Sequence, residues 1–267
     1  MWWGWEEWPP VDPFSLTTLL AAAALAGWVD AVVGGGGLLL LPALLVAAPG
    51  MPVATALGTN KLAAIAGTST AAVTYARRTR LDWAVAGPSA GLAVCCAGVG
   101  AALAGAVPAS AYRPVVLGVL VAVALFVVLR PRLGVVAMPW RRTRWRMVAV
   151  VALAGVVIAL YDGLIGPGTG TFLVVAFTAL VGADFVRGSA MAKVVNAGTN
   201  LGALVVFAAA GHVWWWLGLA MAVCNVAGAA LGARMALRRG AGFVRVVLLV
   251  VVFALVGRLG YDQWLAG

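Results

Sequence analysis

The chain contains only two lysines, Lys61 and Lys193, and both lie within apolar segments that are predicted to be helices. An ionisable side chain inside a membrane-spanning helix costs at least ~2.5 kcal/mol on insertion scales, so it marks a functional site by default. A lysine can also extend its flexible stem to the membrane surface, and Lys193 follows Arg187 closely enough to leave this alternative open. The pair therefore predicts positive charge lining a pathway or pocket inside a membrane.

Two carboxylates, Asp30 and Asp162, are the only acidic residues within the long apolar runs. Each comes shortly before a glycine-rich break. Either one could pair with a lysine, gate a site or carry a coupling proton. An aspartate that caps the end of a broken helix would look the same in the sequence, so this alternative stays open.

Glycine-rich stretches at 34–37 and 166–170 interrupt two long apolar segments. Glycine lowers helix propensity by roughly 1 kcal/mol relative to alanine, and broken backbone in a bilayer must find partners in protein or water. Helices are expected to restart near Leu38 and Thr171, where free N–H groups and the positive dipole end favour an anion. The candidate anion-binding residues at the breaks are Gly36, Gly37, Leu38, Gly168, Thr169, Gly170 and Thr171, with hydroxyl donors on the two threonines.

Polar side chains also lie on the helix that follows each break. Asn196 and Asn200 are three and seven residues after Lys193, so one helical face can hold all three. Such residues could line a pocket or could join helices through hydrogen bonds, which is their commoner use. The candidate binding residues in these helices are Thr59, Asn60, Asn196, Thr199 and Asn200.

Composition places the chain among polytopic membrane proteins. The 267 residues are 64% hydrophobic and 10% charged, with a mean hydropathy of +1.06. The net charge of +10 does not indicate nucleic acid binding, because the arginines cluster in short loops between apolar runs. Cys95, Cys96 and Cys224 show no metal-ligand spacing, and no metal or cofactor is expected.

The predicted organisation has four parts. Residues 1–13 form an outer, tryptophan-rich interfacial strap, 14–130 a first transmembrane half, 131–146 a basic linker and 147–267 a second half. The first half is predicted as a broken hairpin over 14–48 and helices at 53–76, 83–107 and 111–129. The second is predicted as a broken hairpin over 147–180 and helices at 188–210, 213–237 and 243–261.

The two halves are interpreted as a tandem duplication, because Asp30 and Asp162 are 132 residues apart, as are Lys61 and Lys193. A hairpin plus three spans crosses the membrane an odd number of times, which predicts two repeats of inverted topology. If the N-terminus is outside, 14 of the 16 arginines fall on the inner side, in agreement with the positive-inside rule. The prediction is an all-α, multi-pass protein of the plasma (inner) membrane, with both termini outside.

The duplicated motifs resemble the sulfite exporter TauE/SafE family of anion permeases. The resemblance rests on the two glycine-rich hairpins, on the run from Ala56 to Lys61 and on the run from Ala192 to Asn200, and it covers nearly the whole chain. The resemblance implies an integral membrane transporter of sulfite, sulfonates or related sulfur-containing anions, with proton coupling.

The resulting hypothesis is a secondary transporter that moves a small sulfur oxyanion by alternating access around a midplane site. Lys61 and Lys193 would supply positive charge, and Asp30 and Asp162 would serve as gate or proton sites. The expected partners are the anion, the lipid bilayer and a second copy of the chain in a homo-oligomer. An anion channel of the same architecture, an intramembrane enzyme and a non-transporting scaffold are the alternatives; no nucleophile–base set is recognisable for the enzyme.

Overall fold

The computed structural model describes residues 12–104, the single positions 118, 121, 125, 128 and 129, and residues 134–265, without the side chains of 255 and 258–265. The strap predicted at 1–13 therefore lies outside the described residues except for its last two positions, and the span predicted at 111–129 lies largely outside them. The described chain is helical throughout, which confirms the predicted all-α class.

Four helices make up the described part of the first half. Asp12 caps the first one, because its carboxylate accepts the N–H groups of Phe14 and Ser15, and Gly34 ends it in the left-handed region at φ 86°. The broken hairpin predicted over 14–48 is thus two helices. The elements are α1 (Pro13–Val33), α2 (Gly36–Ala47), α3 (Val53–Ala76) and α4 (Trp83–Leu103).

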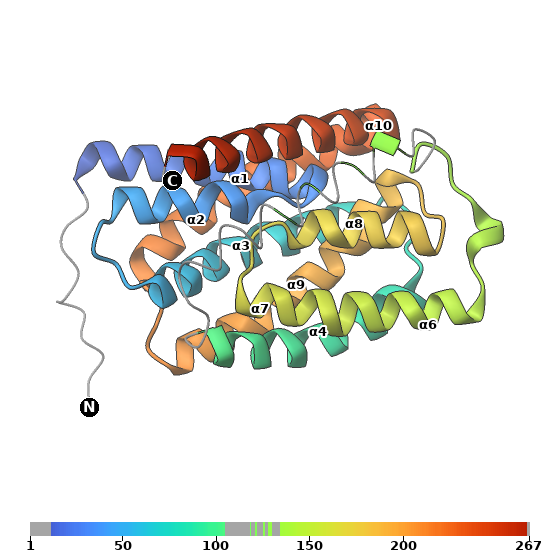
Figure 1. Ribbon diagram of the computed structural model, residues 1–267, viewed down its shortest axis with the longest axis horizontal. Helices are drawn as coiled ribbons and strands as arrows, with labels where there is room; N and C mark the ends of the chain where they lie inside the picture. The colour runs from blue at the N-terminus through green and yellow to red at the C-terminus, as the bar shows by residue number, and fades with distance from the viewer. Residues whose placement is uncertain are drawn as a thin grey trace.

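The second half repeats this order after a short 3₁₀ turn, η2 (Pro139–Arg141). A continuous helical stretch comes first, made of α6 (Arg144–Ala152), the π-helical η3 (Leu153–Ile158) and α7 (Ala159–Leu164). The chain then forms α8 (Thr169–Leu180), α9 (Phe185–Ala209) and α10 (Trp215–Leu265). Gly240, at φ 75° and ψ −170°, divides α10 into two helices that run in opposite directions (Figure 1).

The helix bounds repeat at the offset of the charged residues. α9 begins 132 residues after α3, and α10 begins 132 residues after α4. The offset between α2 and α8 is 133, because four residues separate α7 from α8 whereas two separate α1 from α2. The second break is therefore wider than the first.

The two broken hairpins enter the helix bundle from opposite ends, and their tips meet near its middle (Figure 1). Backbone meets backbone there, because a Cβ atom added at Gly34 would lie 2.1 Å from the carbonyl carbon of Gly170. Only glycine permits such an approach, and Gly34 also needs the left-handed conformation.

One end of the bundle holds the basic loops. Arg142 makes a bidentate ion pair with Asp82 at the start of α4, with Nε–Oδ2 at 2.6 Å and Nη2–Oδ1 at 3.2 Å. The linker also bonds to the α8–α9 connection, through Met138 N–H to the Gly182 carbonyl at 2.7 Å. The described arginine loops of both halves thus lie together, away from the start of α1 and the end of α10 (Figure 1).

Three predicted boundaries were wrong by a few residues. α2 and α8 begin at Gly36 and Thr169, two residues before the predicted starts at Leu38 and Thr171, because glycine can occupy the first positions of a helix. α9 begins at Phe185, so Arg187 lies in its first turn and not in a loop. The Asp184 carboxylate accepts the Arg187 N–H at 2.9 Å and caps the helix earlier than the hydropathy pattern indicates.

All four helices that are long and apolar enough to cross a membrane, among the described residues, match predicted spans or hairpin arms. They are Pro13–Val33, Trp83–Leu103, Arg144–Leu164 and Phe185–Ala209. A helix of 21 residues is about 31 Å long, close to the thickness of a hydrocarbon core.

The contact between the hairpin tips gives a first prediction. Gly34→Ala should destabilise the protein by at least ~1–3 kcal/mol, because alanine is strained at positive φ and its Cβ would overlap Gly170. Gly87→Ala is the matched control, since a Cβ there meets no atom within 4 Å and the position is helical. Thermal unfolding in detergent measures both variants, and equal melting temperatures would contradict the tip contact.

Candidate functional site

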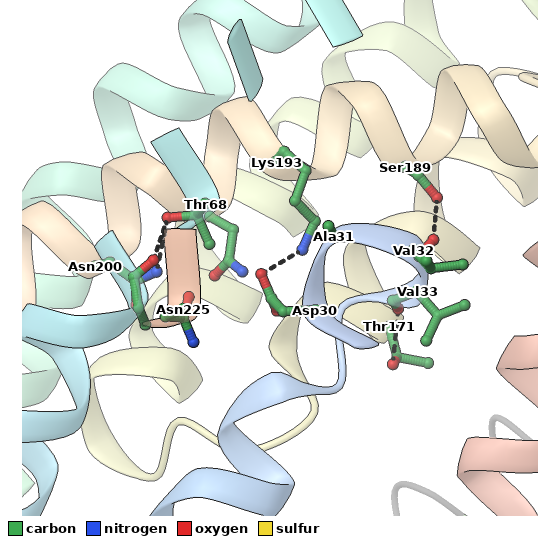
Figure 2. A network of polar contacts seen from close by, with 12 residues as sticks. Asp30, Ala31, Val32, Val33, Thr68, Thr171, Ser189, Lys193, Asn200 and Asn225 are labelled. Carbon is green, nitrogen blue, oxygen red and sulfur yellow. Dashed lines mark hydrogen bonds and ion pairs between the residues drawn. The ribbon is translucent and has the colours of Figure 1, made fainter. Parts of the chain in front are cut away.

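Two ion pairs connect the halves crosswise at the broken helices. Lys61 of α3 contacts Asp162 of α7, with Nζ 2.6 Å from Oδ2. Lys193 of α9 contacts Asp30 of α1, with Nζ 2.9 Å from Oδ2 (Figure 2). Each lysine therefore pairs with the carboxylate of the other half, and an exchange of the two halves converts one pair into the other.

Both pairs are buried. The side chains of Lys61 and Asp162 are each 3% exposed, Lys193 is 0% exposed and Asp30 is 14% exposed. Lys193 therefore does not reach a membrane surface, and the snorkelling alternative is wrong for this residue. Pairing reduces the large cost of placing charge in a medium of low dielectric constant, and it leaves the four ionised groups with no net charge.

Neither carboxylate caps a helix, so that alternative is also wrong. Asp30 lies within the last turn of α1, and Asp162 lies within α7. The N-cap positions of α2 and α8 are Gly35 and Gly168, and neither helix has a side-chain cap. The N–H groups at both helix starts thus have no side-chain acceptor from their own caps.

Three hydroxyl groups from three helices hold the C-terminal end of α1 (Figure 2). The Tyr75 hydroxyl of α3 donates to the Ala31 carbonyl at 3.0 Å, and the Ser189 hydroxyl of α9 donates to the Val32 carbonyl at 2.9 Å. The Thr171 hydroxyl of α8 donates to the Val33 carbonyl at 3.1 Å. These bonds satisfy carbonyls that a helix end leaves without partners, and they fix the first break to its neighbours.

The hydroxyl bonds at the second break stay within its own hairpin. The Tyr161 hydroxyl donates to the Pro167 carbonyl and the Thr169 hydroxyl to the Gly166 carbonyl, both at 2.8 Å. Residues that correspond to the three hydroxyl donors at the first break are apolar, namely Phe207, Leu57 and Leu38. The two breaks therefore share a pair of charges but differ in how their backbone is supported.

A hydrogen bond joins equivalent residues of the two halves near the centre. The Asn200 amide donates to the Thr68 hydroxyl at 3.3 Å, and these residues are 132 apart in the sequence (Figure 2). The Asn225 amide donates to the Ala23 carbonyl at 3.0 Å. Sequence reasoning did not select Thr68, Tyr75, Ser189 or Asn225, although buried polar side chains in apolar helices were the available signal.

Other predicted residues serve local structure. Thr59 accepts the N–H of Trp214 at 2.9 Å, just before α10. The Thr199 hydroxyl donates to the Asn196 carbonyl at 3.0 Å within α9. Leu38 belongs to the apolar core at 7% exposure. Asn60 differs from these residues, because its buried Oδ1 finds no hydrogen-bond partner among the described residues.

These features define a class of protein. Apolar helices of spanning length, two helices broken near the middle of the bundle and buried paired charges at the breaks are typical of a multi-pass membrane transporter. Residues 19–259 match the family model of the sulfite exporter TauE/SafE. The chain belongs to this family, and it is a membrane transporter of that family.

Curated relatives agree with this assignment over nearly their whole length. The chain is 36% identical over 248 residues to "Probable membrane transporter protein ORF9" of Sinorhizobium sp, covering 92% of this chain and 93% of the relative. It is 34% identical over 253 residues to "Probable membrane transporter protein YfcA" of Escherichia coli strain K12, covering 95% and 92%. A Haemophilus influenzae "Probable membrane transporter protein" is 30% identical over 257 residues, covering 93% and 95%. No solved structure matches the chain significantly.

The buried pairs generate a prediction about stability. Lys61→Ala should destabilise the protein by roughly 3–5 kcal/mol, because it leaves the Asp162 carboxylate buried without its partner. The double variant Lys61→Met/Asp162→Leu removes both charges at similar volume, so it should recover most of the stability. Thermal unfolding of the two variants and the wild-type chain measures this difference.

The alternative outcome is informative. If Lys61→Ala and the double variant unfold at the same temperature, the charges do not interact in the folded protein. Conserved folding of the double variant would also make it the matched reference for function, since it lacks the charges but keeps the packing.

Proposed function

We propose that this transporter moves a small sulfur-containing oxyanion across the plasma membrane as a proton-coupled secondary transporter. The observation that supports this proposal is the crosswise pairing of Lys61 with Asp162 and of Lys193 with Asp30. The family description names sulfite, and the buried lysines are suited to an anion that has lost its hydration shell.

The paired charges suggest how a proton and an anion would be coupled. An anion that entered alone would compete with a carboxylate for its lysine and would leave a buried negative charge without a partner. Protonation of Asp162 or Asp30 neutralises that carboxylate and frees the lysine for the anion. One anion and one proton then enter together without changing the net charge of the site, which avoids a large desolvation cost.

The helix starts provide further favourable contacts in this proposal. The first N–H groups of α2 and α8 point toward the centre of the bundle from opposite hairpins, and helix N-termini stabilise anions. The hydroxyl groups of Thr169 and Thr171 donate to the carbonyls of Gly166 and Val33, so they would have to leave these acceptors to donate to an anion.

An inverted repeat with alternating access is part of the same proposal. It is supported by the 132-residue offset of the helices, by the entry of the hairpins from opposite ends and by the reciprocal ion pairs. Rocking of one half against the other would open the site first toward one end and then toward the other.

An anion channel of the same architecture is the second candidate. The buried, fully paired charges favour a transporter, because conduction requires a continuous path and this site is closed by side chains that are 0–14% exposed.

Flux measurements with Asp162→Asn test the coupling. Wild-type protein in liposomes should take up sulfite with saturation and in response to an imposed pH gradient. Asp162→Asn cannot exchange a proton, so it should lose the response to the pH gradient but keep anion exchange between equal solutions. The double variant Lys61→Met/Asp162→Leu is the control for lost binding and should show neither activity.

Two results would count against the proposal. An unchanged pH dependence in Asp162→Asn would remove this residue from proton coupling. Flux that rises linearly with sulfite concentration and ignores the pH gradient would favour the channel.

A separate prediction concerns orientation in the membrane. The basic linker should face the cytoplasm and the α9–α10 loop the outside, because positively charged loops stay inside. In a variant without Cys95, Cys96 and Cys224, an impermeant thiol reagent added to whole cells should label His212→Cys but not Thr143→Cys. Both positions are exposed. Labelling of Thr143→Cys from outside would reverse the assigned orientation.

A further inference from the structure

The space beside Asn60 distinguishes the two halves of the site. Asn60 lies on α3 directly before Lys61 and is 6% exposed. Its Oδ1 is a buried acceptor without a hydrogen-bond partner among the described residues. Leaving such an oxygen unsatisfied is costly, so it indicates a place for a hydrogen-bond donor that comes from outside the chain.

The surroundings of Asn60 fit a small ligand. A Cβ added at Gly37 would lie 3.8 Å from Nδ2 of Asn60 and 3.9 Å from Cα of Pro167, so the amide faces both hairpin tips at ordinary contact distance. A Cβ added at Gly166 would lie 3.7 Å from Nζ of Lys61. The orphan oxygen, the first turn of α2, the wider second break and one ammonium group thus meet at one place.

The equivalent place in the other half is closed. Residue 192, which corresponds to Asn60, is alanine. Gly34 and Gly170 pack backbone to backbone there, with an added Cβ only 2.1–2.4 Å from the opposite chain. The hydroxyl groups of Ser189 and Thr171 hold this first break in place. The Lys193–Asp30 pair therefore stands beside a fixed contact, whereas the Lys61–Asp162 pair stands beside Asn60.

From this asymmetry we infer that the ligand occupies the half-site at Asn60, between Gly37 and Pro167, and that Asn60 selects an oxyanion carrying an O–H group. The inference rests on the proposed function and narrows its substrate class. Because Oδ1 only accepts hydrogen bonds, it attracts the O–H of a monoprotonated anion such as bisulfite and repels the bare oxygens of sulfate. Lys61 and the N–H groups of α2 take the oxygens that bear the negative charge.

Binding of bisulfite to purified full-length protein tests the inference. In mildly acidic buffer, where sulfite carries its proton, bisulfite should stabilise the wild-type chain against heat more strongly than sulfate does at equal concentration. Asn60→Ala should weaken bisulfite affinity by about tenfold, the effect of one lost hydrogen bond, and should reduce the preference over sulfate. Its melting temperature without ligand should not fall, because the variant removes an unsatisfied buried oxygen.

Asn225→Ala is the matched control. Asn225 is also a buried amide, at 4% exposure, but it bonds to the Ala23 carbonyl. This variant should lower the melting temperature and keep wild-type affinity and selectivity for bisulfite. The two asparagine variants therefore have opposite expected effects, which separates a ligand contact from a structural one.

The outcomes distinguish the inference from the proposed function. If wild-type protein binds bisulfite but Asn60→Ala binds it equally well, or if wild-type protein binds sulfate as tightly, the half-site assignment is overturned and anion transport stands. If no sulfur oxyanion stabilises the wild-type protein and none crosses the liposome membrane, the proposed function is overturned and the assignment with it.

Discussion

The structure depends on the need to pair four charges inside an apolar helix bundle. An unpaired lysine or aspartate at this depth would cost several kcal/mol, so each charge requires an opposite one within contact distance. The chain meets this requirement between its halves, with Lys61 on Asp162 and Lys193 on Asp30. Because neither half contains its own pair, neither can place its charges without the other, and the two broken hairpins must meet at the centre.

The close contact of the hairpin tips follows from this pairing. Carboxylates near the ends of α1 and α7 reach lysines on the opposite half only if the breaks approach one another, and glycine at the breaks permits it. Membership of the TauE/SafE family and the names of the curated relatives then give these buried charges their context, which is transport across a membrane.

A duplicated framework does not make the two halves equal. The first break has two non-helical residues and is held by hydroxyl groups from α3, α8 and α9. The second has four non-helical residues, bonds within its own hairpin and lies beside the unsatisfied oxygen of Asn60. One half thus provides a fixed support, and the other provides space and hydrogen-bonding capacity for a ligand. Such asymmetry allows a repeat protein to keep one framework while specialising one site.

The sequence by itself determined the helical membrane class, the two broken hairpins, the 132-residue offset and the four charged residues, because hydropathy, glycine runs and rare intramembrane charges are local signals. It could not decide whether Lys193 snorkels or Asp30 caps a helix, since both choices depend on which atoms lie nearby. Only the tertiary structure decided that each lysine meets the aspartate of the other half, that hydroxyls as far along the chain as Tyr75 and Ser189 hold the end of α1, and that Asn60 keeps an oxygen without a partner. Those contacts join residues more than forty positions apart, and periodicity within a helix carries no information about them.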